Sequence, residues 1–149
     1  MKRKAYAQWR GDLKNGEGFL STDSGTLTNT PYSFGKRFGD EPGTNPEELI
    51  GAAHAGCFSM AFSGELQKKN LTPDLIDVKA EVSLEKIGDG WGIPAVNLIV
   101  RASVPGADRA VVEEAAQIAK TNCPVSKLLK ANITMDFEFT ESEASSAMM

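Results

Sequence analysis

Residues 44–69 read TNPEELIGAAHAGCFSMAFSGELQKK, and this stretch decides the fold. It opens with the signals of a helix start: Asn45 suits the N-cap, Pro46 the first helical position, and Glu48 the place of a capping-box acid. From there to Phe62 the residues are apolar or small on every face of the predicted helix. A helix that is apolar all round is buried on all sides, so we expect it at the centre of the molecule.

The segments before this helix predict a small antiparallel meander. Residues 5–10 alternate in character, and clusters of Gly, Asp, Asn and Ser follow at the turn positions, which favours two or three short strands. The stretch from Thr30 to Gly43 holds two prolines and three glycines, so it is expected to be a surface connection.

The segments after the helix complete the predicted order of elements. We expect a hairpin of two strands over 78–84 and 96–104, a helix over 107–121, a short helical piece from Cys123 through Leu129, and a last strand over 133–139. This order segregates strand pairs around helices. It predicts an α+β fold with antiparallel sheets packed around the long central helix.

The length of 149 residues is typical of one domain, which we place at residues 1–140, and residues 141–149 predict a disordered tail. With 16 Lys and Arg against 20 Asp and Glu, the net charge is −4, without the basic excess of nucleic-acid-binding proteins. No apolar run has the length of a signal peptide or a membrane span. We therefore expect a cytoplasmic protein with neither a nucleic-acid nor a membrane partner.

The central helix also predicts an assembly. One small sheet can cover only one face of it, and the opposite apolar face still needs a partner. A second copy of the chain is the simplest partner that could bury this face, so a homodimer is expected.

The two cysteines, Cys57 and Cys123, are the first candidates for chemistry. In a reducing compartment a permanent disulfide is unusual, so they are either inert core thiols or a redox pair. Cys123 precedes Pro124 at a predicted helix start, where free backbone N–H groups stabilise a thiolate. The two thiols can pair only if the fold brings their Cα atoms within about 7 Å.

His54 stands three residues before Cys57 and opens two alternatives. These two residues and Cys123 could bind a metal ion, but a structural zinc site needs four nitrogen or sulfur ligands and the chain has three. A Cys–His hydrolase is the other alternative, although no orienting group or oxyanion hole is evident. A packed or interface histidine is favoured over both.

Glu47 falls in the first turn of the helix, about 15 Å along the axis from Cys57 at the usual rise per residue. One helix therefore cannot place both in one site. Two copies packed antiparallel about a twofold axis near Ala52 would bring Glu47 of one chain to Cys57 of the other, and the small residues around Ala52 allow that approach. Complementing the helix dipole is an equally weighted role for Glu47.

Two stretches resemble a known family. Residues 43–61, GTNPEELIGAAHAGCFSMA, and residues 122–126, NCPVS, are similar to the two halves of the signature of the OsmC/Ohr family, the osmotically inducible and organic-hydroperoxide-resistance proteins. The resemblance extends over almost the whole chain. It implies a thiol-dependent peroxidase of oxidative and osmotic stress defence, built as an intertwined α+β homodimer with active sites at the subunit interface, without metal or bound cofactor.

The resemblance also implies roles for four residues. Cys57 matches the peroxidatic cysteine, Cys123 the resolving cysteine, and Glu47 the acid that holds an arginine in place. In the Ohr branch that arginine comes from the first hairpin, where this chain has Lys14-Asn15-Gly16; in the OsmC branch it comes from the loop before the long helix, which offers Arg37. The OsmC branch is therefore favoured, with Arg37 as the cation.

The implied partners are a hydroperoxide substrate, organic and also hydrogen peroxide, and a dithiol reductant of lipoyl or thioredoxin type. The main rival from another class is a noncatalytic dimer that binds a small molecule or a partner and keeps both cysteines in its core. Only the peroxidase would lose two thiols per chain to one equivalent of an organic hydroperoxide.

Overall fold

The computed structural model describes residues 1–141, so the tail predicted over 141–149 lies, beyond Glu141, outside the described residues. The chain forms two compact units, an N-terminal unit of Met1–Leu49 and a C-terminal unit that begins at Ile50. No helix within residues 1–141 is both long and apolar enough to cross a bilayer.

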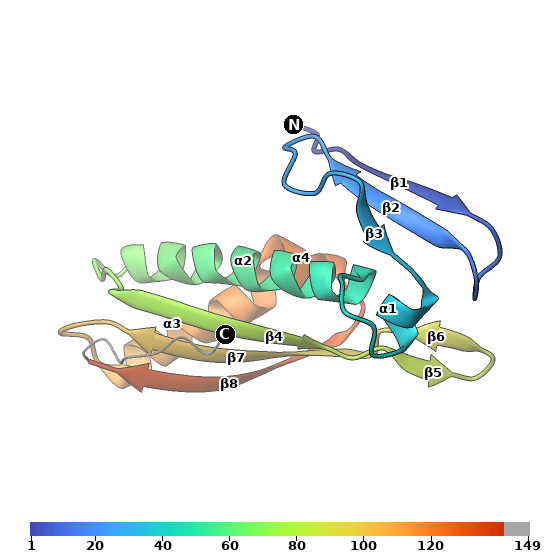
Figure 1. Ribbon diagram of the computed structural model, residues 1–149. Helices are drawn as coiled ribbons and strands as arrows, with labels where there is room; N and C mark the ends of the chain where they lie inside the picture. The colour runs from blue at the N-terminus through green and yellow to red at the C-terminus, as the bar shows by residue number, and fades with distance from the viewer. Residues whose placement is uncertain (142–149) are drawn as a thin grey trace. The chain divides into compact units, whose positions relative to one another are not determined.

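The N-terminal unit contains the predicted antiparallel meander (Figure 1). Its strands are β1 (Ala5–Arg10), β2 (Glu17–Thr22) and β3 (Thr30–Tyr32), hydrogen-bonded in that order. Gly18 in β2 lies opposite both Trp9 and Tyr32, whose ring centroids are 5.5 Å apart. A Cβ atom at Gly18 would come within 2.6 Å of each ring, so only glycine lets these two aromatic side chains meet over the sheet.

The expected surface connection is wrong in one respect, because it contains β3 and a short helix, α1 (Phe34–Phe38). Ser33 is the N-cap of α1, and its hydroxyl accepts a hydrogen bond from the Lys36 backbone N–H at 3.3 Å. Phe34 and Phe38, four positions apart, place their ring centroids 5.0 Å from each other on one face of the helix. The cap and the aromatic pair explain why a stretch rich in glycine and proline still forms a helical turn.

The long helix α2 (Pro46–Gln67) begins as predicted. The Asn45 side chain accepts from the Glu48 backbone N–H at 2.8 Å, which confirms the N-cap. The second half of the predicted capping box is different, because the Glu48 carboxylate accepts from the Thr44 hydroxyl at 2.9 Å.

Within residues 1–141, only one face of α2 is covered. Residues at helical spacing on that face are buried: Gly51, His54, Phe58, Phe62 and Leu66. The opposite face is exposed and small or apolar: Ala52, Ala53, Gly56 and Met60. The expectation of burial on all sides is therefore not met by a single chain.

The C-terminal unit is built on a three-stranded sheet in the order β4-β7-β8, formed by β4 (Leu75–Val82), β7 (Ala95–Ser103) and β8 (Asn132–Thr140). The predicted pairing of the two middle strands is confirmed as antiparallel. Between them the expected turn holds a small hairpin of β5 (Glu85–Ile87) and β6 (Gly90–Gly92).

The last strand corrects the expectation of antiparallel sheets, because β8 runs parallel to β7 and the sheet is mixed. The chain returns from β7 to β8 through α3 (Arg109–Asn122) and α4 (Pro124–Leu128). Such a helical crossover brings the chain back to the end from which it started, so the next strand must run parallel.

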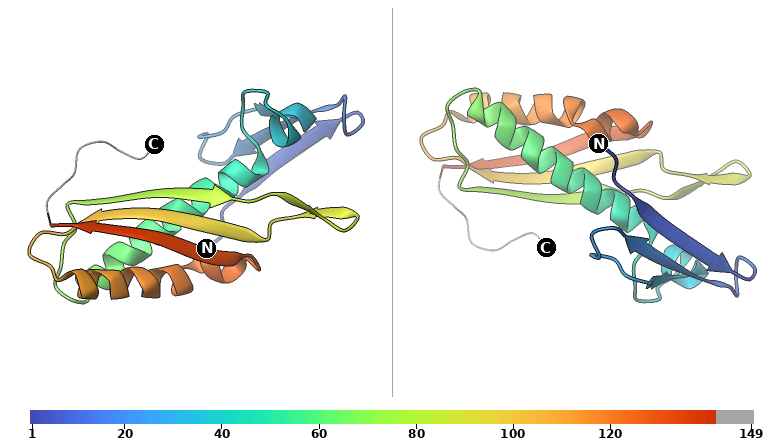
Figure 2. Two further views of the ribbon diagram at one scale, coloured as in Figure 1. Left: turned by 90° about the horizontal axis from the view of Figure 1, so that it is seen from below. Right: turned by 90° about the horizontal axis from the view of Figure 1, so that it is seen from above.

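The core of this unit lies between the helices and one face of the sheet. Helix α2 crosses the sheet obliquely, and α3 follows the β8 side of the sheet (Figure 2). The even-numbered residues of β7 from Val96 to Ala102 are buried and point toward α2 and α3, as the alternation of a strand requires. Phe58 and Phe62 of α2 and Val112 of α3 fill the layer above them, so this packing fixes the position of the residues next to Phe58.

Candidate active site

Two free thiols meet in the C-terminal unit. Cys57 projects from the middle of α2, and Cys123 is the N-cap that joins α3 to α4. The two side chains are in hydrogen-bonding contact, although 66 positions separate them in the sequence. Cys123 is only 1% exposed, whereas Cys57 is partly accessible. The fold therefore places the two cysteines next to each other, as a redox pair requires.

The surroundings of Cys57 raise the pKa of its thiol. Burial is the main cause, and the neighbouring Cys123 adds to it, whereas the backbone N–H of Val125 donates to the sulfur and lowers the pKa. Sequence reasoning assigned the N–H groups at the start of α4 to Cys123, but the Val125 N–H serves Cys57. These influences include no cation, so thiolate formation at Cys57 calls for one from elsewhere.

A buried polar chain continues from Cys123 into the core. The Cys123 sulfur lies 3.1 Å from the Ser126 hydroxyl oxygen, which in turn lies 2.7 Å from Nε2 of His54. His54 is fully buried and Ser126 is 8% exposed. Sequence reasoning missed Ser126, although the residue closes the NCPVS motif, because a bond between side chains 72 positions apart has no local signal.

The position of His54 bears on the two alternatives raised for it, a metal site and a Cys–His hydrolase pair. Its Nε2 bonds to Ser126 rather than to Cys57, so the Cys–His hydrolase pair is not formed. Within residues 1–141, His, Cys, Asp and Glu side chains form no group of three or more suited to a metal ion. Burial lowers the pKa of His54, which keeps the imidazole neutral. His54 is therefore buried in the core, as the favoured interpretation expected, and its ring is bonded to Ser126.

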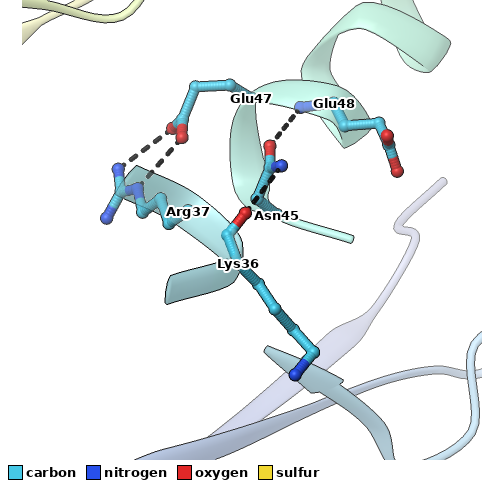
Figure 3. A network of polar contacts seen from close by, with 5 residues as sticks. All are labelled: Lys36, Arg37, Asn45, Glu47 and Glu48. Atoms are coloured by element: carbon cyan, nitrogen blue, oxygen red, sulfur yellow. Dashed lines mark hydrogen bonds and ion pairs between the residues drawn. The ribbon is translucent and has the colours of Figure 1, made fainter. Parts of the chain in front are cut away.

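The N-terminal unit brings Arg37 and Glu47 together in a bidentate ion pair (Figure 3). Arg37 Nε lies 3.0 Å from Glu47 Oε1, and Nη2 lies 3.0 Å from Oε2. The Glu47 side chain is 9% exposed, whereas that of Arg37 is 37% exposed. Asn45 also bonds the carbonyl of Lys36 at 3.2 Å, which ties the start of α2 to α1. A largely buried carboxylate thus holds an accessible guanidinium in one orientation.

A pocket of about 250 Å³ opens beside this arginine. Its lining is mostly aromatic and apolar: Trp9, Leu13, Tyr32, Ser33, Phe34, Arg37 and Phe38. The Arg37 guanidinium also lies 5.2 Å from the centroid of the Phe38 ring, a cation–π distance. Sequence reasoning did not find this pocket, because Trp9 and Leu13 on one side and residues 32–38 on the other come from different parts of the sequence.

Each unit contains groups that can take part in chemistry. The C-terminal unit places two thiols where they can be oxidised to a disulfide, which needs no metal or bound cofactor. The N-terminal unit presents a fixed cation at the edge of an apolar pocket. A guanidinium of this kind stabilises negative charge that develops on a reacting oxygen.

Comparison with known proteins places these features in a family. Residues 39–138 match the family described as OsmC-like protein. Over 136 residues the chain is 50% identical to Peroxiredoxin OsmC of Escherichia coli, covering 91% of this chain and 95% of that protein. An Organic hydroperoxide resistance protein of Xanthomonas axonopodis is 36% identical over 105 residues, 70% of each chain.

Solved structures agree with the sequence relatives. The organic hydroperoxide resistance protein OhrB of Bacillus subtilis superposes with a TM-score of 0.69 at 28% identity, covering 92% of this chain and 98% of that one. The greater identity to the OsmC protein agrees with the expected branch. The chain described here belongs to the OsmC-like family, in its OsmC branch.

Proposed function

We propose that this protein is a cysteine-based peroxidase that reduces organic hydroperoxides, and also hydrogen peroxide, with Cys57 as the peroxidatic and Cys123 as the resolving residue. The observation that carries the proposal is the contact between two free thiols in a chain half identical to a peroxiredoxin. The thiolate of Cys57 attacks one peroxide oxygen, the O–O bond breaks, and an alcohol leaves after protonation. Cys57 is left as sulfenic acid.

Arg37 is the cation we assign to the first step. The pKa of Cys57 is raised by its own surroundings, so a positive charge must offset this before the thiolate becomes abundant at neutral pH. A guanidinium is a permanent cation, and Glu47 holds Nε and Nη2 of Arg37 in place. The remaining guanidinium N–H groups are then available to the alkoxide that forms as the O–O bond breaks.

A homodimer is part of the proposal. The exposed face of α2 consists of small residues and one methionine, Met60, which is 80% exposed in the single chain. Two such faces packed antiparallel about Ala52 would cover each other and would bring Glu47 of one chain to the level of Cys57 of the other. Gly56 has no Cβ that would keep the two helices apart, and within the single chain the space next to it is open.

The pocket beside Arg37 supports an organic substrate. Hydrogen peroxide needs no apolar wall, whereas the alkyl or aryl part of an organic hydroperoxide gains from leaving water. The aromatic lining of this pocket would bind that part while the guanidinium faces the peroxide oxygens. We expect hydrogen peroxide to be a poorer substrate for this reason.

The reductant we propose is a dithiol of lipoyl or thioredoxin type. In the reduced chain Cys123 is buried and Cys57 is partly accessible, so we expect Cys57 to be the more accessible sulfur of the disulfide as well. A reductant thiolate would therefore attack Cys57, release the Cys123 thiol and form its own disulfide with its second sulfur. Such reductants belong to reducing compartments, so we also propose a cytoplasmic location and a role in oxidative and osmotic stress defence.

Thiol counting tests the proposal. One equivalent of tert-butyl hydroperoxide should remove two free thiols per chain without forming a bridge between chains. Cys57→Ser should keep its remaining thiol, and Cys123→Ser should pass to sulfenic and then sulfinic acid. A noncatalytic binding protein would keep both thiols. Comparing peroxide consumption with dihydrolipoyl compounds and with thioredoxin then identifies the class of reductant.

A further inference from the structure

The buried chain from Cys123 through Ser126 to His54 is not used by the attack on peroxide. We propose that it is a proton relay for the second step, in which Ser126 passes the Cys123 proton to Nε2 of His54 as Cys123 attacks the oxidised Cys57. This inference rests on the proposed function, because the relay acts on the disulfide-forming step. Ser126 and His54 are then positioning residues, because they act through Cys123 and do not touch the peroxide.

The need for a relay follows from burial. A free thiol with a pKa of about 8.5 is mostly protonated at neutral pH, and only its thiolate attacks a sulfenic acid efficiently. The Cys123 side chain is 1% exposed, so solvent has little access to its proton. The Ser126 hydroxyl, at 3.1 Å from the sulfur, is the polar group placed to take it.

The distances let the proton continue beyond Ser126. A hydroxyl has one hydrogen and two lone pairs, so it can accept from the thiol while it donates to an imidazole nitrogen. The 2.7 Å separation from His54 Nε2 is short enough for that second bond. When the thiol proton moves to Ser126 and the serine proton moves to Nε2, every bond of the chain is kept and only its direction reverses.

The state of His54 suits an acceptor. It is fully buried, and desolvation lowers its pKa, so the ring is neutral before the step. When Nε2 accepts from Ser126, the ring hydrogen is on Nδ1, and Nδ1 has no hydrogen-bond partner among the described residues. A buried N–H without a partner is costly and uncommon, so its retention in the core calls for a role beyond packing.

The step balances without a further reagent. The Cys123 sulfur forms a bond to the Cys57 sulfur, the S–O bond of the sulfenic acid breaks, and the oxygen leaves as hydroxide. The proton held by His54 returns through Ser126 and is taken up as hydroxide becomes water. The net change is one sulfenic acid and one thiol converted into one disulfide and one water.

Few titratable groups act on the cluster. The cluster consists of Cys123 and Ser126 at the start of α4 and His54 on α2. Cys57, one turn after His54 on α2, faces it. Burial is the cause of the lowered pKa of His54, and Cys123 adds to the raised pKa of Cys57. The pH dependence of the second step is therefore expected to report this cluster.

A two-mixing experiment on the whole 149-residue chain tests the relay. One equivalent of tert-butyl hydroperoxide first forms the sulfenic acid at low pH, and a second mixing jumps the pH to values between about 6 and 9.5, spanning the free-thiol pKa of about 8.5. Quenching with an alkylating reagent and mass analysis then gives the rate of disulfide formation. The variants are His54→Gln, Ser126→Ala and Ser126→Thr, with Ser59→Ala as the matched control.

We expect His54→Gln and Ser126→Ala to slow disulfide formation at least about tenfold at pH 6 to 7, with the deficit narrowing as the pH rises and hydroxide takes over the slow removal of the buried proton. Glutamine can bond Ser126 but cannot take up its proton, and Ser126→Thr, which keeps the hydroxyl, should restore most of the rate. Ser59→Ala, a partly buried serine that bonds Ala55, should behave as the parent chain. The first step should change little in all four variants.

Two results would overturn the relay. Disulfide formation at the parent rate in Ser126→Ala excludes the relay. A loss of rate that is the same at every pH also excludes it, because it would mean that Ser126 and His54 only hold α4 against α2. Should His54→Gln fail to fold, Ser126→Ala and Ser126→Thr decide alone. A parent chain that forms no disulfide with peroxide would refute the proposed function itself, which is a different outcome from equal rates in parent and variants.

Discussion

Replacing Arg37 by alanine should slow the attack of Cys57 on organic hydroperoxide at neutral pH. Without a cation, burial and Cys123 leave the pKa of Cys57 above the usual value, and even a free thiol of pKa about 8.5 is only roughly 3% thiolate at pH 7. If Arg37 makes the thiolate the main form, its loss reduces the reactive fraction about 30-fold or more, equivalent to about 2 kcal/mol of barrier.

The assay is stopped-flow oxidation of the reduced protein by tert-butyl hydroperoxide between about pH 6 and 10, with iodoacetamide alkylation to follow the thiolate fraction separately. Because removal of the cation raises the pKa of Cys57, the rate of Arg37→Ala should rise with pH toward that of the parent. Any deficit that persists at high pH measures stabilisation of the departing alkoxide. Arg37→Lys should recover thiolate formation better than rate, since lysine lacks the planar fork that Glu47 grips.

Arg10, which ends β1, provides the matched control. An unchanged second-order rate in Arg37→Ala, combined with a loss of about tenfold or more in Arg10→Ala, would refute the assignment of the cation. Glu47→Gln should give a weaker defect of the same kind, because the amide keeps one hydrogen-bond acceptor but loses the charge that orients the guanidinium.

Three further outcomes are expected. Cys57→Ser should abolish turnover, whereas Cys123→Ser should complete one oxidation and then gain a second oxygen, as mass spectrometry would show; continued turnover by Cys57→Ser would contradict the assignment. Ala52→Leu on the exposed face of α2 should overpack the helix pair and weaken the dimer by about 1 to 3 kcal/mol, and sedimentation of the parent as a folded micromolar monomer would contradict the dimer. Burial lowers the pKa of His54, so below the ordinary histidine pKa of 6.5 the imidazole takes up a proton in the unfolded chain but not in the native state. The free energy of unfolding in urea should therefore fall as the pH drops below 6.5, by at most about 1.4 kcal/mol per pH unit. His54→Gln should remove that pH dependence.

Local signals in the sequence were enough to locate α2 and its N-cap. The bond from the Glu48 N–H to the Asn45 side chain closes within four residues, so it depends on little beyond that segment. Alternation in the strands likewise identified the buried face of β7, because a period of two survives in any sheet with one covered side.

The parts that sequence reasoning missed depend on the path of the chain in space. The direction of β8 follows from the crossover through α3 and α4, and alternation is the same in parallel and antiparallel strands. The bond between His54 and Ser126 joins residues 72 positions apart, and the spacing of His54 to Cys57 pointed to a different partner. The N–H groups at the start of α4 were assigned to Cys123, whereas the Val125 N–H bonds the sulfur of Cys57 on α2.

Peptide mapping after a single oxidation is the most direct test of the central claim, that Cys57 and Cys123 form a peroxidatic and resolving pair within one chain. The reduced protein is treated with one equivalent of tert-butyl hydroperoxide, alkylated, digested without reductant and analysed by mass spectrometry. The account predicts a peptide pair that joins residues 57 and 123 of the same chain, lighter by two hydrogen atoms and formed before any sulfinic acid. Two alkylated cysteines in the treated protein, or a bridge only between chains, would contradict it.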